Sequence, residues 1–306
     1  MYFPRHKPLA RLTTLLVLIV ALPAASARAM NVPTPQSAAH PAGGSLTWRS
    51  TSTTPTKIAY IGLENMGLWR AMKHMPYLKG LSKTYGKTVG LQDSLPDDPS
   101  LPHYLLDAFG TSFGVHDDKP PRAHSFHGQT IYGNAVANGR TARIYNQSMT
   151  GTCALTDQGT LFKVRHEGGL PYALDERTLC SRISVPLEGN LKADVSAGTL
   201  PNLGWIDPDV AHDGHKPSTP ADADTYLRTL IPMLMSGPDY ARGNLVIVVS
   251  ADETSGSQPM LWVTIHPSLH GVKLSEKHSQ LDVYRTFLRF GGSPRSSGDM
   301  LTGYGL

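Results

Sequence analysis

The sequence predicts an α/β protein, a three-layer sandwich around a mainly parallel central sheet, and two apolar runs with flanking helical patterns carry that prediction. Residues 245–249, Leu-Val-Ile-Val-Val, are mostly β-branched and show no polar alternation, which is typical of a strand buried on both faces. Residues 58–63 form a second run of this kind. Helical periodicity is clearest at 222–234 and 281–290. Strands that alternate with helices in this way favour a sheet covered on both faces.

Shorter elements follow from the same periodicities. Apolar residues recur at helical spacing from Trp69 to Leu81, and Pro76 is expected to break or restart that helix. We interpret this stripe as core packing. Asp222 is expected to cap the helix at 222–234. The remaining predictions are a helix at 130–137, strands at 141–145, 201–206 and 260–265, and a loop-rich excursion at 153–180.

The first 29 residues have the three parts of a secretory signal. Arg5, Lys7 and Arg11 form a basic front, residues 15–25 an apolar core, and Ala-Arg-Ala at 27–29 a cleavage site. The apolar run is short for a membrane span, so we expect no stable span; a retained anchor is the alternative. We therefore expect a secreted or periplasmic protein, with a mobile leader at 30–56 and a single domain at 57–306.

The basic charge balance belongs to the expected signal. The chain holds 28 Lys and Arg against 24 Asp and Glu; four of the basic residues and no acid lie in 1–29, which leaves 24 against 24. This removes the basic footprint that nucleic-acid binding needs. In an exported chain, two cysteines pair more often than not, so Cys153 and Cys180 are expected to form a disulfide worth about 3–4 kcal/mol. A zinc site would need more soft ligands.

Polar residues follow both buried runs. Asp252 and Glu253 come shortly after the run at 245–249, and Glu64 and Asn65 directly after the run at 58–63. Ligands of open α/β sheets bind beyond the carboxyl ends of the strands, so we expect these residues to share one site. The ordinary alternative is a solvated loop or a helix N-terminus, which favours acids.

Two further stretches carry candidate chemistry. Pro102 suits the first turn of a helix, which places Ser100 at or beside the N-cap, in a positive field that favours phosphate. Ordinary capping is the alternative role for that serine. Residues 207–215 hold three Asp and two His, a pattern that can bind a metal from one side or form a polar surface turn.

Taken in order, these pieces resemble the secreted bacterial phosphoesterase family of acid phosphatases and phospholipase-C-type enzymes, which has the alkaline-phosphatase-like fold. The resemblance spans roughly residues 57–291. Residues 61–65 look like the family's first strand ending in Glu-Asn, and 99–104 like its Pro-Ser-x-Pro-Asn-Tyr nucleophile turn. Residues 153–154 and 164–166 match its disulfide loop and basic pair. Residues 206–215 match its Asn-Asp-x-His segment, and 250–253 its strand-end Asp-Glu pair.

The resemblance implies a metal-dependent hydrolase of small-molecule or lipid phosphoesters, acting through a phosphoseryl intermediate with Ser100 as the nucleophile. Hard oxygen and amide ligands would hold a divalent metal ion. Asp213 and His215 would bind a second ion or orient the leaving group. The implied ligands of the first ion are Glu64, Asn65, Asp252 and Glu253, and the implied phosphate contacts are His103 and His166.

The sequence also departs from the family pattern. His103 stands where the family has Asn, and Asp98 replaces a His before the nucleophile turn. Gln280 falls on the family's late His, unless His278 takes that position through a longer loop. The alternative function is therefore a catalytically impaired relative that binds a ligand or the cell surface. A metal-free serine esterase is disfavoured because the chain has no Gly-x-Ser-x-Gly turn.

Overall fold

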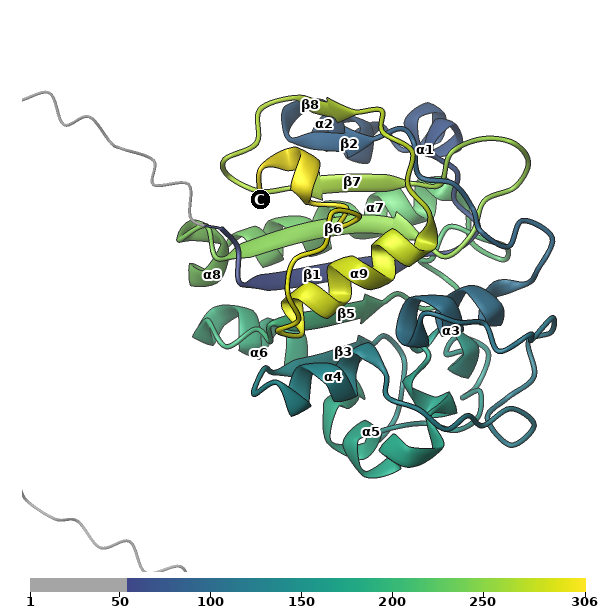
Figure 1. The fold of residues 1–306 in the computed structure, drawn as a ribbon. Helices are drawn as coiled ribbons and strands as arrows, with labels where there is room; N and C mark the ends of the chain where they lie inside the picture. Colours follow the sequence, from purple (N-terminus) through teal and green to yellow (C-terminus); the bar gives the residue numbers. More distant parts are fainter. Residues whose placement is uncertain (1–53) are drawn as a thin grey trace, which may run out of the picture. The chain divides into compact units, whose positions relative to one another are not determined.

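The computed structural model describes residues 54–306, which form an eight-stranded sheet with the order β4-β3-β5-β1-β6-β7-β2-β8 (Figure 1). The central strands β1 (Lys57–Leu63) and β6 (Leu245–Ala251) pair in parallel from end to end. On one side, β5 (Leu203–Asp207), β3 (Ala142–Asn146) and β4 (Ser184–Pro186) continue the parallel sheet. On the other side, β7 (Trp262–Ile265) runs antiparallel to β6, and β2 (Gly86–Thr88) and β8 (Val272–Leu274) complete the sheet.

Helices cover both faces of the sheet, which confirms the three-layer sandwich. Alternate residues of β1 divide between two cores, since Tyr60 packs into one and Ile61 into the other. The Tyr60 core includes residues of α3 (Ser100–Phe109), α4 (Ile131–Ala137), α5 (Arg177–Ile183) and α9 (Gln280–Phe290). The Ile61 core includes residues of α1 (Leu68–His74), α2 (Pro76–Thr84), α6 (Asn190–Ala197), α7 (Pro220–Met235) and α8 (Pro238–Ala241).

Two local predictions need correction. Trp69 was expected in the core, but its side chain is 50% exposed on α1. Asp222 was expected to cap α7, but the N-cap is Thr219, and Asp222 lies three residues later as its partner in a capping box. Asp222 therefore does stabilise the start of the helix, but as the capping-box partner and not as the N-cap. The strands β2, β4 and β8 were not predicted, because a strand of three residues is too short to show a hydrophobic period.

The expected signal at 1–29 and most of the expected leader at 30–56 lie outside the described residues. At the start of the described chain, the Thr56 amide donates to the Asn244 carbonyl over 3.0 Å. This bond joins the residue before β1 to the residue before β6. Within residues 54–306, the helices are too short or too polar to cross a membrane.

Cys153 and Cys180 form a disulfide, as expected, with their Cα atoms 5.3 Å apart. The bond joins α5 to the segment that follows β3. The chain between the two cysteines contains three short 3-10 turns, η1 (Val164–His166), η2 (Leu170–Tyr172) and η3 (Leu174–Glu176). The loop-rich excursion is thus confirmed, and it carries His166 on a cross-linked segment.

A buried acid, Glu167, lies just after η1. Its Oε1 accepts a hydrogen bond from the Ser184 hydroxyl, which in turn accepts one from Asn146 Nδ2 over 3.0 Å. Glu167 is fully buried, and its Oε2 has no hydrogen-bond partner among the described residues. Burial raises the pKa of Glu167 to about 8, and the hydrogen bond from Ser184 only partly opposes that rise.

We expect Glu167 to make the protein less stable as the pH rises from about 5 to about 8. The unfolded chain releases this proton near the ordinary pKa of 4.5, whereas the folded protein keeps it until about 8. The folded state therefore binds more protons in that window, and the free energy of unfolding falls by about 1.4 kcal/mol for each pH unit. Glu167→Gln should flatten this part of the profile, as measured by chemical denaturation. The exposed Glu276→Gln is the control, and parallel profiles for Glu167→Gln and wild type would contradict the assignment.

Candidate active site

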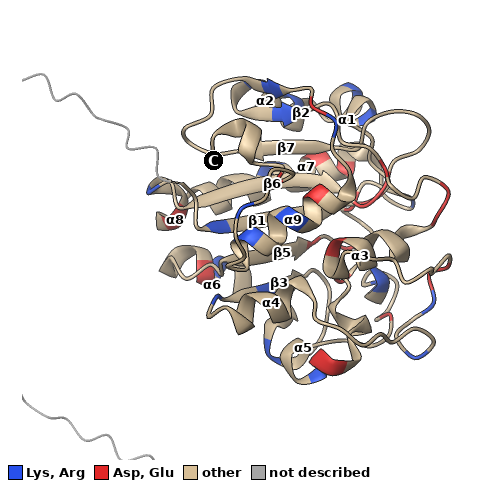
Figure 2. Cartoon of the chain, viewed as in Figure 1, with Lys and Arg blue, Asp and Glu red and all other residues tan. Residues whose placement is uncertain are grey.

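The carboxyl ends of β1 and β6 meet at one edge of the sheet and bring the expected acids together. Leu63 and Ala251 are partners in the parallel register, so Glu64 and Asp252 follow them side by side. The Asn65 amide donates to Asp252 Oδ1 over 2.9 Å. Asn65 adopts a positive φ of 46°, which asparagine tolerates better than most residues. Figure 2 shows acidic segments around this end of the sheet, near α3.

Ser100 contacts these acids and does not cap its helix. It is the first residue of α3, and the N-cap position belongs to Pro99, which makes no side-chain cap bond. The Ser100 hydroxyl lies 2.9 Å from Glu64 Oε2 and 3.2 Å from Glu253 Oε1, in hydrogen-bonding position to both. Asp118, which the sequence did not indicate, caps the helix instead: its Oδ1 accepts a hydrogen bond from the Leu101 amide over 3.0 Å.

Tyr104 is a second site residue that sequence reasoning missed. Its hydroxyl donates a short hydrogen bond to Glu64 Oε1, while Ser100 approaches the other oxygen of the same carboxylate. Tyr104 lies four residues after Ser100, so the two side chains share one face of α3. This four-residue spacing could have indicated from the sequence that Tyr104 belongs to the site. Tyr104 also stacks on His166, with ring centroids 5.7 Å apart.

Burial raises the pKa values of all three carboxyl groups at this edge, and repulsion from Asp252 adds to the rise for Glu64 and Glu253. Glu64 is affected strongly, first by burial and then by the charges of Asp252 and Asp213. Burial likewise raises the pKa of Asp252, and it raises that of Glu253 to about 7, with Asp252 adding to the effect. Three acids crowded in a low-dielectric site repel one another unless protons or a cation offset their charge.

Basic side chains reach the cluster from η1. His166 Nε2 lies 3.3 Å from Glu64 Oε2, yet the pKa of this buried imidazole is lowered, first by burial and then by Arg165. His166 therefore favours its neutral form. Arg165 Nε lies 3.4 Å from Asp118 Oδ2, which places a guanidinium beside the N-terminal turn of α3. The sequence analysis gave Arg165 no role of its own. Its position next to His166 was the feature that could have indicated one.

The segment after β5 contributes less directly than expected. The Asp213 carbonyl accepts from the Glu64 amide over 2.9 Å, which ties its loop to the site. However, the Asp213 carboxylate accepts bonds from the His215 amide and the Ser218 hydroxyl of its own loop. Burial raises the pKa of Asp213 to about 7. His215 is largely exposed; partial burial of its ring lowers its pKa, and the charge of Asp252 opposes the change.

Gln280, and not His278, faces the acids from α9. Gln280 Nε2 donates to the Asp252 carbonyl over 2.7 Å, and its Oε1 lies 3.1 Å from His103 Nδ1. His278 lies instead beside Asp282, at 3.5 Å. His103 is completely buried, and it is linked to the acid cluster through its contact with Gln280.

The charge of Asp98, a departure from the family pattern, is also engaged away from the acids. Its Oδ1 lies 2.6 Å from Nδ1 of the exposed His116. The Asp98 carboxylate is therefore held in a local hydrogen bond.

The donor set suits a hard divalent cation. Among residues 54–306, no three Asp, Glu, His or Cys side chains stand in position to hold one ion without rearrangement. Two buried oxygens at the strand ends, Asn65 Oδ1 and Asp252 Oδ2, nevertheless have no hydrogen-bond partner there. With the Glu64 carboxylate and the Ser100 hydroxyl beside them, they form an all-oxygen set of the kind that Mg²⁺ or Ca²⁺ prefers.

Comparison with known proteins agrees with this architecture. No curated protein sequence matches the chain. A crystal structure of an alkaline phosphatase superfamily protein from Vibrio parahaemolyticus is similar at a TM-score of 0.54 and 12% identity, over 81% of this chain and 69% of that one. Ps i-CgsB in complex with k-i-k-neocarrahexaose is similar at 0.50 and 12%, over 81% and 74%. These likenesses confirm the alkaline-phosphatase-like fold.

The sequence profile described as the phosphoesterase family matches residues 48–261. The matched stretch is more than half of the chain, and it includes β1, the start of α3 and the end of β6. It therefore contains Glu64, Ser100 and Asp252, the residues that meet at the edge of the sheet. The chain belongs to the phosphoesterase family and is a phosphoric ester hydrolase.

Proposed function

We propose that this protein is a secreted, metal-dependent phosphoester hydrolase in which Ser100 is the nucleophile. The position of the Ser100 hydroxyl carries the proposal. It stands at the N-terminus of α3, makes no cap bond, and lies between Glu64 and Glu253 from the two central strands. A helix N-terminus favours a phosphate group, and an adjacent carboxylate can accept the hydroxyl proton. Secretion is proposed from the signal-like first 29 residues alone.

The proposed reaction transfers the phosphoryl group to Ser100 and then to water. Ser100 Oγ attacks phosphorus in line with the ester oxygen, and its proton passes to Glu64 or Glu253. The ester bond breaks, and the leaving oxygen takes a proton from solvent to depart as the alcohol, while the carboxyl group releases its proton to solvent. Water later attacks the phosphoserine and gives one proton to that carboxylate, which passes it to Ser100 Oγ as phosphate leaves. Neutral His166, 3.3 Å from Glu64, is placed to exchange a proton with the reacting oxygens. The Tyr104 hydroxyl fixes the Glu64 carboxylate during these steps.

The negative charge of the site is the reason to propose a metal. A phosphoester anion would meet the carboxylates of Glu64, Asp252 and Glu253. Of the basic groups described above, His166 lies 3.3 Å from Glu64, and Arg165 lies beside the start of α3. A divalent ion, when bound, would offset this charge and lower the pKa of the Ser100 hydroxyl. Glu64, Asn65, Asp252 and Glu253 are the residues that we propose to hold it. Asp213 and His215 remain candidates for a second ion, and His103 and His166 for phosphate contacts.

Replacing Glu64 by Gln should separate the repulsion among the acids in the metal-free protein from the stabilisation that a bound metal gives. In metal-free protein above pH 7, the variant should melt at a higher temperature than wild type, because a repelling buried carboxyl group is removed. The same variant should lose most of the rise in melting temperature that Mg²⁺, Mn²⁺ or Zn²⁺ gives wild type. Scanning calorimetry and metal analysis measure both effects, with the exposed Glu276→Gln as the matched control. Equal metal responses in wild type and Glu64→Gln would contradict the proposed site.

Replacing Ser100 by Ala or Gly should abolish release of phosphate from an aryl phosphate. Loss of a nucleophile lowers turnover by several orders of magnitude, whereas metal content should stay close to that of wild type. Both variants should fold, because Ser100 makes no cap bond whose loss would cost about 1 kcal/mol. Exposed Ser275→Ala is the control.

The assay distinguishes the alternatives. Near-normal phosphate release by both Ser100 variants would exclude Ser100 as the nucleophile. Faster release of sulfate from an aryl sulfate than of phosphate would make the ester class wrong. No release by wild type with any divalent metal would favour a catalytically impaired ligand-binding protein, which the complete burial of His103 supports.

A further inference from the structure

A cavity of about 410 Å³ lies at the opposite end of β3 from the acid cluster. Its lining includes Ala142 and Arg143, the first residues of β3, whereas the last residue, Asn146, pairs with Asp207 at the carboxyl edge. Nothing in the proposed hydrolysis uses this cavity. Its volume lies within the range of small-molecule sites.

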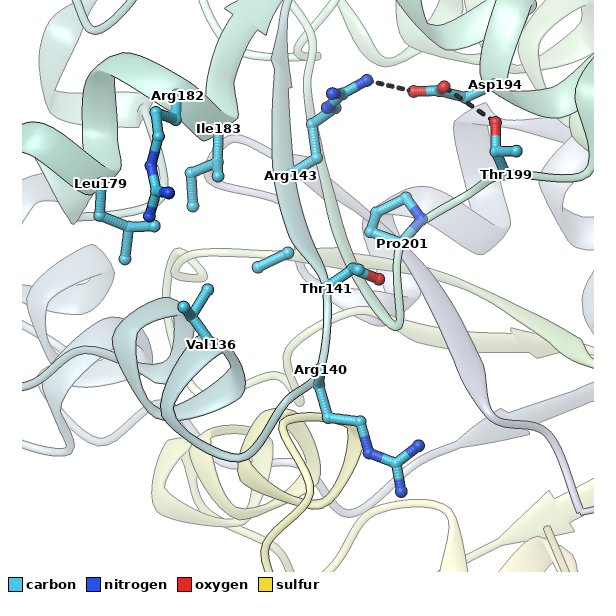
Figure 3. A pocket seen from close by; sticks show the side chains of 11 residues that line it. Val136, Arg140, Thr141, Arg143, Leu179, Arg182, Ile183, Asp194, Thr199 and Pro201 are labelled. Atoms are coloured by element: carbon cyan, nitrogen blue, oxygen red, sulfur yellow. Dashed lines mark hydrogen bonds and ion pairs between the residues drawn. The ribbon is translucent and has the colours of Figure 1, made fainter.

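The inner wall of the cavity is apolar. Leu179 and Ile183 of α5 line it from the core side, and Val136 of α4, 40% exposed, forms part of the opening. Figure 3 shows these three side chains gathered on one side, with the Arg182 guanidinium beside Leu179. A wall of this kind offers no hydrogen bonds, so it favours the hydrocarbon part of a ligand.

The rim of the cavity carries positive charge without a local counter-charge. Within the described chain, the exposed side chains of Arg140 and Arg182 have no ion-pair or hydrogen-bond partner. The acid that lines the cavity, Asp194, is engaged elsewhere. It accepts from Arg143 over 2.6 Å, from the Tyr145 hydroxyl over 2.7 Å and from the Thr199 hydroxyl over 3.1 Å. Asp194 therefore balances Arg143 and leaves the Arg182 guanidinium for a ligand, whereas the Arg140 side chain points away from the apolar wall (Figure 3).

We propose that this cavity binds a small, soluble amphiphilic anion, with a carboxylate or tetrahedral anionic head at Arg182 and a short hydrocarbon body over Val136, Leu179 and Ile183. Arginine suits such heads because its planar guanidinium can donate two parallel hydrogen bonds. An inorganic anion alone leaves the apolar wall without a partner, and a neutral alcohol leaves the Arg182 guanidinium unpaired. The proposal concerns a second site and does not rest on the hydrolase activity.

Isothermal titration calorimetry on the full chain tests this proposal with four probes. Octanoate and octyl sulfonate, which resist hydrolysis by a phosphoesterase, should bind with measurable affinity below their micelle concentrations. Octanol and inorganic phosphate should each bind at least ten-fold more weakly than the better amphiphile. Comparing octanoate with octyl sulfonate shows which anionic head the site prefers.

Variants locate the binding. The variants Arg182→Gln and Val136→Asp should each weaken binding of the better amphiphile at least ten-fold. The exposed Arg122→Gln is the matched control and should leave it unchanged. Melting temperature and hydrolysis of an aryl phosphate should be the same in all of these proteins, because the substituted side chains lie outside the core and the acid cluster.

Four results would overturn the proposal. The first three are that neither amphiphile binds, that octanol binds as tightly as the anions, or that the arginine and Val136 variants bind as well as wild type. The fourth is arginine-dependent binding to vesicles of anionic lipid without binding of the soluble amphiphiles, which would assign the face to a lipid surface instead.

Discussion

The parallel pairing of β1 with β6 is the constraint on which the rest of the structure depends. Both strands are buried on both faces, so their side chains must fit the two cores at once. A slip of one residue would move Tyr60 into the core that now holds Ile61 and reverse every neighbour on the strand. The same slip would separate Glu64 from Asp252. Packing far from the edge thus fixes the geometry of the acids with no ligand required.

The site combines groups that are unfavourable when considered alone. Glu64 and Asp252 are almost completely buried, and burial of a charged carboxyl group opposes folding. They remain at the edge because Tyr104, Ser100 and the Asn65 amide supply hydrogen bonds to them. This is the pattern expected of a functional site, where local cost is offset by the stability of the surrounding sheet.

Sequence predicted most of what periodicity and chain direction determine. The uninterrupted apolar runs located β1 and β6, and their direction predicted that the residues after them would meet. Pro102 located the start of α3, and hence Ser100, within a residue. Sequence could not determine how each side chain uses its hydrogen bonds. The exposure of Trp69, the cap bond from Asp118 and the use of Asp213 by its own loop depend on tertiary neighbours that no local pattern encodes.

The bond from the Asn65 amide to Asp252 joins residues 187 positions apart in the chain. Contacts of such long range form late, because closing a long loop costs entropy before the strands on either side can pair. The acid cluster therefore cannot exist in a nascent chain that has not yet produced β6. Until then Glu64 and Ser100 belong to a partial sheet without their charged neighbours. In this architecture the acid cluster forms only when β1 and β6 pair.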